Sequence, residues 1–244
     1  MSNIDTMENI LNLASNNAIK LNDDAILFLQ EGDHEKTTNA LFDAVACLDA
    51  LSSINQQPIQ GDKLEHHQKA DELPQALPRI DCVPIPEDLA DGGTEQDDVF
   101  PYFNRALSVQ IEKGGITHET HARVSSILLY NMALSHHHEA IRRYKSSELC
   151  NALKLYELSY CTIERAKDHM RMEDVFILLL ALFFNMACIH QKLFNAAECQ
   201  HCVDWLQKAM ASREIITLTD EEYFFFSTNI SLFSFQMPHW APAA

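Results

Sequence analysis

The sequence predicts an all-α protein built from helical hairpins, and three observations lead to this prediction. Apolar residues recur at intervals of three and four over several long segments, as on one face of a helix. The triplet Asn-Met-Ala occurs at 131–133 and again at 185–187, each time at the end of an apolar run and followed by a His three residues after its Ala. The chain has 6 glycines among 244 residues, too few for an enzyme fold with several Gly-rich phosphate loops. Such internal repetition indicates stacked helical hairpins.

Residues 1–54 are expected to form the first hairpin. Apolar residues between Ile10 and Phe28 predict a helix over 6–31. Gly32 is suited to ending that helix in a left-handed turn, and Asp33 is suited to capping the next one. The second helix is expected to fade near Ile54.

Residues 55–98 differ in composition and predict a long, acidic, Pro-containing loop that interrupts the helices. The segment holds five prolines, and between Asp81 and Asp98 it has seven acidic residues and no basic one. Such a segment buries too little apolar surface to offset its ordering entropy, so we expect it to be mostly disordered. Within it, the apolar run 73–86 is the part best suited to docking, and 99–111 is expected to be ordered and extended.

Residues 99–234 are expected to resume the helical array. The expected helices cover residues 117–144, 146–168, 173–192, 195–212 and 219–232. Thr219 and Glu222 form a capping box, and Asn195 with Glu198 resembles one. The aromatic residues at 223–226 are expected to cap the open end of the array. In the tail, 235–244, the large apolar residues either fold back over the last helices or form a short partner-binding motif.

Cysteine usage and hydropathy predict a cytoplasmic or nuclear protein. Most of the 7 cysteines lie in predicted helices, which favours reduced, buried thiols over a disulfide framework. The N-terminus lacks a basic stretch followed by an apolar one, so no signal peptide is expected. From Val175 to Ile189 only Asn185 is polar, but this run is shorter than the ~20 residues that a bilayer requires. We therefore expect an inner helix that is covered on several sides.

The hairpins resemble the tetratricopeptide repeat (TPR) family, in which small residues sit where two helices cross and large ones lie between them. The resemblance covers residues 16–53 and 120–210 and rests on matching positions in three units: Ala25, Phe28, Leu41 and Ala44; Ala133, His136, Ala152, Tyr156 and Ser159; Ala187, His190, Cys199 and Val203. Thr37 departs from the family's Ala, and the usual Trp and the terminal Pro of each unit are missing.

The resemblance implies a right-handed superhelix of about three TPR-like hairpins plus a C-terminal capping helix. It also implies a concave surface, built from the first helix of each hairpin, that binds a peptide or helix. The residues expected to face that groove are Tyr130, Leu134, His137, Phe184, Cys188 and Gln191. A Lys and Asn pattern for clamping a C-terminal carboxylate is not evident in the sequence.

Two clusters allow other chemistry. Cys188, His190, Cys199 and Cys202 are ligand types that zinc prefers, but the last two cysteines lie within a predicted helix, where packing explains them better. We therefore assign no metal ligands. The His136–His138 run, followed by Arg142 and Arg143, is the basic concentration of the chain and would suit a small anion or phosphopeptide. The alternative is a solvated loop in which His136 alone points inward.

These observations favour a non-enzymatic protein-protein interaction module with an unidentified protein or peptide partner. The net charge of -17 argues against nucleic acid and anionic membranes as partners, because phosphate binding needs clustered Lys and Arg. Neither a cofactor nor a small-molecule substrate is expected. The alternatives are a metal-binding or catalytic protein that uses the Cys and His cluster, and a structural subunit of a larger assembly.

Overall fold

The computed structural model describes residues 3–55, 79–86, 102–110 and 118–236, and these residues are mostly helical. The helices are α1 (Asn3–Gln30), α2 (His34–Asn55), α3 (His118–Arg143), α4 (Ser146–Ala166), α5 (Phe176–Lys192), α6 (Ala196–Met210) and α7 (Asp220–Gln236). Short 3-10 turns cover Lys167–His169, Met172–Asp174 and Arg213–Thr217. The predicted helices are confirmed, with bounds that differ by a few residues.

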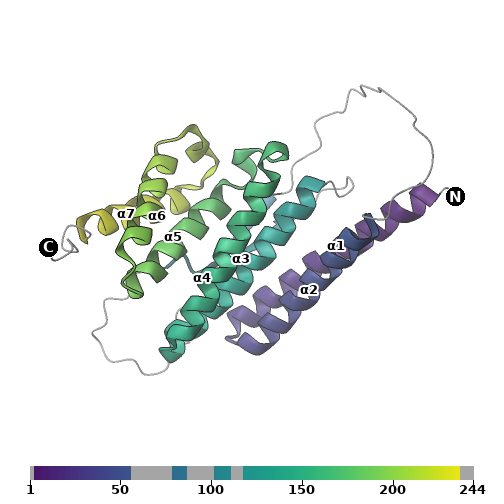
Figure 1. Cartoon of the computed structure of the whole chain (residues 1–244), viewed down its shortest axis with the longest axis horizontal. Helices are drawn as coiled ribbons and strands as arrows, with labels where there is room; N and C mark the ends of the chain where they lie inside the picture. Colours follow the sequence, from purple (N-terminus) through teal and green to yellow (C-terminus); the bar gives the residue numbers. More distant parts are fainter. Residues whose placement is uncertain (1–2, 56–78, 87–101, 111–117, 237–244) are drawn as a thin grey trace.

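Six of these helices form three antiparallel hairpins, in which α1 packs on α2, α3 on α4 and α5 on α6. Successive hairpins touch through α2 with α3 and through α4 with α5, and α7 follows against α6 (Figure 1). The first helices of neighbouring hairpins also touch, α1 with α3 and α3 with α5. The hairpins therefore pack one after another, in the order in which they occur in the sequence.

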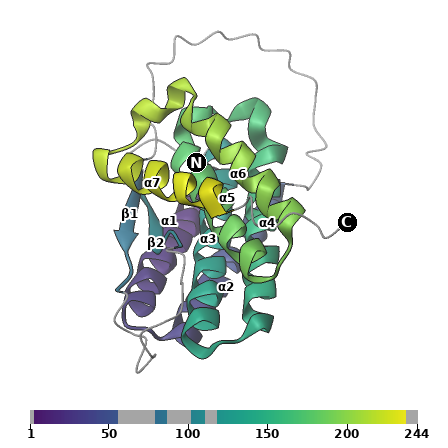
Figure 2. The same ribbon diagram turned by 90° about the vertical axis from the view of Figure 1, so that its left-hand side faces the viewer.

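A two-stranded antiparallel sheet departs from the all-α prediction. Strand β1 (Arg79–Pro84) pairs with β2 (Arg105–Gln110), with Cys82 opposite Leu107. Figure 2 shows the two strands beside α1 and α7. Strand β2 contacts both α1 and α3, so the sheet lies against the first helices of two hairpins.

Strand β1 lies inside the segment 55–98, within the run 73–86 that we expected to be the part best suited to docking. Here the chain pairs with β2 and buries Ile85, which is 3% exposed. The expectation of an extended segment within 99–111 is confirmed by β2. The rest of the acidic loop and the tail at 237–244 lie outside the described residues.

The small residues chosen from the sequence lie in the core. Ala25, Ala44, Ala133, Ala152 and Ala187 are all buried, and Cys199 packs so close to α5 that its thiol lies 3.5 Å from the carbonyl oxygen of Ala187. Nearly every side chain of α5 is buried, as expected for an inner helix. Among the described helices, none is both long and apolar enough to cross a membrane.

The predicted ends of the helices are confirmed in two cases and wrong in one. Gly32 has a φ of 74°, and the amide of Lys36 donates to the Asp33 carboxylate at 3.0 Å. The Thr219 and Glu222 side chains exchange hydrogen bonds with each other's amides. The side chain of Asn195 makes no capping bond and lies instead 3.4 Å from His190 Nδ1, so the second capping box is wrong.

We expect Thr219→Ala to lower the free energy of unfolding by about 1 kcal/mol, because one of the first amides of α7 loses its partner. Urea denaturation measures the change. Thr162→Ala is the matched control, since that hydroxyl bonds only a carbonyl of its own helix. Adding Glu222→Ala to Thr219→Ala should cost less than the sum of the single changes, and full additivity would contradict a reciprocal cap.

Candidate functional site

The six residues predicted to line an open groove lie on α3 and α5, but five of them are buried. Tyr130, Leu134 and His137 on α3, and Phe184 and Cys188 on α5, are each at most 1% exposed. Only Gln191 is partly exposed. The expectation of an open surface at these positions is therefore wrong. For Tyr130, His137 and Phe184, the reason is that the chain's own segment 102–110 and helix α7 cover the face on which they lie.

The segment is held near its start by Asn185, which with His190 is one of two polar residues among the buried residues of α5. The Asn185 carbonyl oxygen accepts the Phe103 amide at 2.8 Å, and its amide group donates to the Phe103 carbonyl at 3.2 Å. The second N–H of the same amide donates to the Tyr156 hydroxyl at 3.0 Å. Every polar atom of this fully buried side chain is thus satisfied, and two of its three bonds go to main chain.

Asn131, the matching residue of the other Asn-Met-Ala triplet, makes the same pair of bonds with Leu107, four residues further along the segment. It accepts the Leu107 amide at 2.9 Å and donates to the Leu107 carbonyl at 2.8 Å. Each repeated Asn therefore bonds both the N–H and the C=O of one residue, an arrangement that we call a clasp. The two residues bound in this way, Phe103 and Leu107, lie on the same edge of the segment. The sequence marked these triplets as repeats but gave no role to the Asn side chains.

Helix α1 contributes a third amide that the sequence analysis missed. Asn22 donates to the Leu107 carbonyl at 3.0 Å and accepts a bond from Asn131 at 2.8 Å. Its neighbour Asp23 accepts the Ser108 hydroxyl at 2.8 Å. The available signal was an Asn on the inner face of a predicted helix, three residues before the small Ala25, where a polar side chain needs a partner.

Tyr130 binds the backbone of the segment between the residues held by Asn185 and Asn131. Its hydroxyl donates to the Arg105 carbonyl at 3.0 Å, and burial raises the pKa of the phenol well above its ordinary value, so the group stays a neutral donor. The main-chain groups of residues 103, 105 and 107 thus face helix side chains. The opposite edge faces β1, as the bond from the Ile85 amide to the Asn104 carbonyl at 2.9 Å shows. On the edge of β2 away from β1, the Leu107 amide and carbonyl and the Arg105 carbonyl therefore have partners on the helices.

Aromatic side chains of α7 and α5 cover the start of the strand. The Phe103 ring stacks on Phe226 at 5.0 Å between centroids and meets Phe225 edge-on at 5.2 Å. Phe184 meets the same two rings from α5. Of the residues at 223–226 predicted to form a cap, Phe225 and Phe226 thus pack against α5 and segment 102–110, whereas Phe224 is 71% exposed.

His137 is the fully buried histidine of the 136–138 run, which corrects the expectation that His136 alone points inward. Its ring lies on Tyr102 at 4.6 Å, beside the bound segment, and neither ring nitrogen has a hydrogen-bond partner. Burial, with Lys192 and His138 adding positive charge nearby, lowers the His137 pKa to about 3. His136 is only partly buried and contacts Glu148.

The suggested anion site is not left free to bind an anion. Arg142 and Arg143 both pair with the buried carboxylate of Glu139, at 2.8 Å and 2.5 Å. A phosphate would have to compete with that carboxylate for both guanidinium groups.

The suggested zinc ligands are not arranged as a metal site. Among the described residues, Cys188, His190, Cys199 and Cys202 do not form a group with ligand atoms in mutual reach. Burial raises the pKa of Cys199 to about 11 and of Cys202 to about 12, and raises that of Cys188 further, so these thiols stay protonated. They act as small core residues of the third hairpin.

A cavity of about 490 Å³ lies between the sheet and the segment that leads into α7. Ile80, Cys82 and Ile177 supply its apolar part, and its five acidic residues are Asp81, Glu173, Asp174, Glu221 and Glu222. Arg105, the one cation lining it, pairs with Glu221. The cavity holds no candidate nucleophile with a lowered pKa, because burial and Glu222 raise the pKa of the Cys82 thiol.

Comparison with protein-family models, with curated proteins and with solved structures gave no match. The likeness to tetratricopeptide repeats therefore stays a prediction. The structure itself defines a mostly helical row of hairpins whose first helices enclose an extended strand.

We expect Asn185→Leu to lower the free energy of unfolding by about 3 kcal/mol, because the amide and carbonyl of Phe103 lose their partners in a buried place. Asn131→Leu should also lower it, by about 1–3 kcal/mol, because the Leu107 amide loses its partner while the Leu107 carbonyl keeps its bond from Asn22. Asn39→Leu, at an exposed site on α2, is the control and should change stability by less than about 0.5 kcal/mol.

Amide hydrogen exchange followed by NMR separates this role from general packing. Asn185→Leu should speed exchange most at Phe103, and Asn131→Leu should speed it most at Leu107. Uniform acceleration over the whole chain in both variants would contradict the two local clasps.

The stability of the protein should fall between pH 7 and pH 5, in part because of His137. Its pKa is about 3 in the folded chain and near 6.5 when unfolded, so in this range only the unfolded state takes up the proton. The loss due to His137 is about 2 kcal/mol at pH 5, and stability recovers as pH rises through 6.5. In His137→Phe, urea denaturation should show a pH dependence smaller by that amount. An unchanged pH dependence would mean that the ring is not buried neutral.

Proposed function

We propose that this protein is a non-enzymatic interaction module of the TPR-like kind, whose groove binds an extended chain by its main chain. The observation that supports this most strongly is the pair of reciprocal bonds from Asn185 to Phe103 and from Asn131 to Leu107. A side-chain amide that bonds both the N–H and the C=O of one residue recognises an extended backbone in any sequence.

The groove in this proposal is the one formed by α1, α3 and α5, and its occupant in the structure is the chain's own segment 102–110. The residues expected from the sequence to contact a partner thus contact a peptide segment supplied in cis. Tyr130 bonds it, His137 stacks on its first residue, and Phe184 packs on the phenylalanines that cover Phe103. A partner peptide would take the place of this segment.

A right-handed superhelical stacking of the hairpins belongs to the same proposal. Contacts between α1 and α3, and between α3 and α5, support it, since in such an array the first helices line one side together. The small residues at the crossings give the spacing that this stacking needs.

The proposed partner is a protein segment in a reducing compartment, the cytosol or the nucleus. All 7 cysteines are free. The groove presents neutral amides and rings, which suits an apolar, extended segment with large side chains at positions like those of Phe103 and Leu107. It does not offer the clustered cations that nucleic acid or an anionic membrane would need. The proposal includes no catalytic step, cofactor or small-molecule substrate.

A fluorescent peptide with the sequence of residues 102–110 tests the proposal on the full-length chain. Phe103→Ala weakens the hold on the internal segment, so this variant should bind the peptide at least tenfold more tightly than the wild type. Fluorescence anisotropy gives the dissociation constants, and circular dichroism checks that the helices persist.

Two controls make the result specific to the clasps. In the Phe103→Ala background, Asn131→Leu together with Asn185→Leu should abolish binding, whereas Asn39→Leu should leave it unchanged. A peptide with Ala in place of its Phe and Leu should bind weakly. The proposal fails if the peptide binds equally with and without the two Asn side chains, or if Phe103→Ala binds no better than the wild type.

A further inference from the structure

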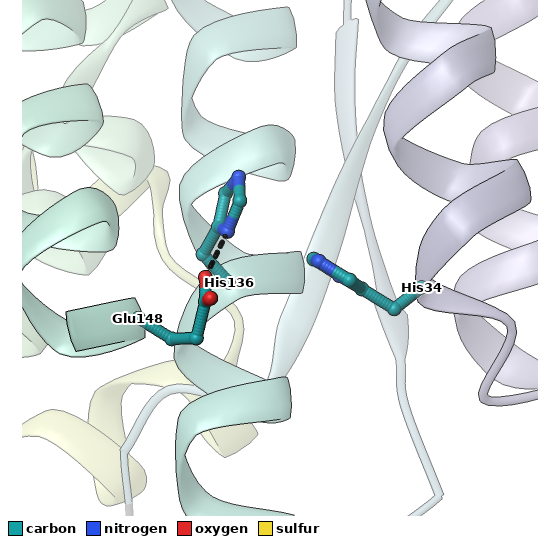
Figure 3. Close-up of side chains that lie close together, drawn as sticks. All are labelled: His34, His136 and Glu148. Atoms are coloured by element: carbon teal, nitrogen blue, oxygen red, sulfur yellow. Dashed lines mark hydrogen bonds and ion pairs between the residues drawn. The ribbon is translucent and has the colours of Figure 1, made fainter. Parts of the chain in front are cut away.

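Three metal-ligating side chains come together between the first and second hairpins, outside the groove. His34 is the first residue of α2, placed there by the Gly32 turn; His136 lies on α3; and Glu148 lies in the first turn of α4. Their ligand atoms all lie within 4.8 Å of one another. Figure 3 shows the His34 ring directed from α2 toward the other two side chains.

The contacts within the cluster are short and hold the rings in place. His136 Nδ1 lies 2.7 Å from a carboxylate oxygen of Glu148, and the rings of His34 and His136 meet edge to face at 4.9 Å. His34 Nδ1 lies 2.7 Å from the Ser135 hydroxyl. In the proposed site, the other ring nitrogen, Nε2, is therefore the one that would bind a metal ion. A hydrogen bond to the second nitrogen is how proteins orient a histidine ligand.

The residue types also suit ligation, because two imidazoles and one carboxylate form a donor set typical of zinc, with a fourth position left for water.

We propose that His34, His136 and Glu148 bind one divalent metal ion of the zinc type, which fastens the first hairpin to the second. Tetrahedral coordination at 2.0–2.2 Å places ligand atoms about 3.3 Å apart. The 2.7 Å pair must therefore open by about 0.6 Å, and the other separations, which are at most 4.8 Å, must close by up to about 1.5 Å. All three groups are only partly buried, which leaves room for this adjustment.

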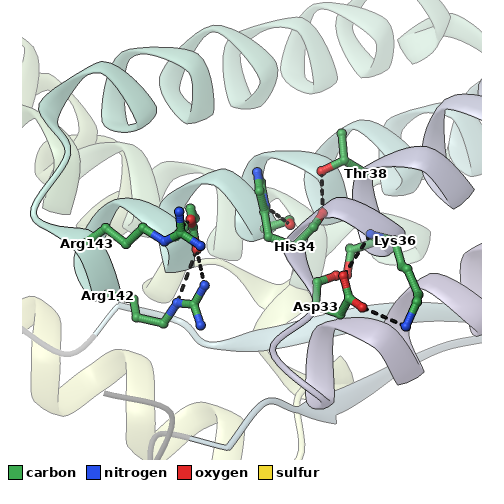
Figure 4. Close-up of polar contacts among 9 residues, drawn as sticks. Asp33, His34, Lys36, Thr38, Arg142 and Arg143 are labelled. Carbon is green, nitrogen blue, oxygen red and sulfur yellow. Dashed lines mark hydrogen bonds and ion pairs between the residues drawn. The ribbon is translucent and has the colours of Figure 1, made fainter. Parts of the chain in front are cut away.

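An open cavity next to His34 gives the ion a way in. It measures about 510 Å³ and is lined by residues of the α1–α2 turn and by the end of α3 (Figure 4). Glu31, Asp33 and Glu35 supply negative charge at its wall. Arg142 and Arg143, on the other side, are both engaged by Glu139, which reduces their repulsion of a cation.

The test is titration of the metal-free, full-length chain with Co²⁺ alone. A Cys150→Ser/Cys161→Ser background removes the two exposed thiols, which could otherwise bind the ion. We expect one Co²⁺ per chain, the visible absorption of a four-coordinate site, and none of the near-ultraviolet absorption that thiolate ligands produce. Zn²⁺ should displace the Co²⁺. At a Zn²⁺ concentration of 100 times its dissociation constant, the melting temperature should rise by about 5–10 °C.

Single substitutions locate the ion. His34→Ala, His136→Ala and Glu148→Gln should each weaken Co²⁺ binding at least tenfold, whereas His201→Ala, at an exposed site on α6, should not change it. Circular dichroism without metal checks that each variant folds. Binding that survives both His34→Ala and His136→Ala, or no binding at 1 mM Co²⁺, overturns the proposal. Neither result bears on the groove, because none of the three ligands contacts segment 102–110 in the bonds described above.

Discussion

The hydrogen bonds from side-chain amides to the backbone of segment 102–110 are the constraint on which the rest of the architecture depends. A strand buried between helices has main-chain groups on two edges, and each unpaired group costs about 1–3 kcal/mol. Strand β1 pairs one edge. A helix cannot pair the other, because its own N–H and C=O groups are used in its internal ladder. Asn131 and Tyr130 therefore supply partners for Leu107 and Arg105 on that edge, and Asn185 does the same for Phe103, just before the strand.

The choice of an amide rather than a charged group follows from burial. A carboxylate could only accept and an ammonium could only donate, and either would carry a large desolvation cost in this place. An Asn side chain is neutral and does both, and its spare N–H reaches a second partner, Asn22 in one case and Tyr156 in the other. The amides thus tie the three hairpins to the strand and also tie the hairpins to one another.

The helices could be predicted from sequence because they depend on local signals. Spacing of apolar residues, the Gly32 turn and the Thr219 cap each act within a few residues. Strand β1 was missed because its stability comes from pairing with β2, more than twenty residues away, and from burying Ile85, whereas its own composition is that of a loop. The residues expected to line a groove lie on α3 and α5, but nothing local shows that a distant segment covers that face. His34 and Glu148 belong to different hairpins, so only the fold brings them beside His136.

The cluster at His34 and the amides at Leu107 both lie where the first hairpin meets the second. The first hairpin meets the rest of the chain through α2 with α3, α1 with α3 and α1 with β2. Asn22 on α1 bonds both Asn131 and Leu107, so a shift of this hairpin away from α3 would break the third clasp on the strand. A metal ion joining His34 to His136 would oppose that shift. By linkage, it would favour the state in which segment 102–110 stays bound, and a peptide that displaces the segment and loosens the hairpin would weaken metal binding by the same factor.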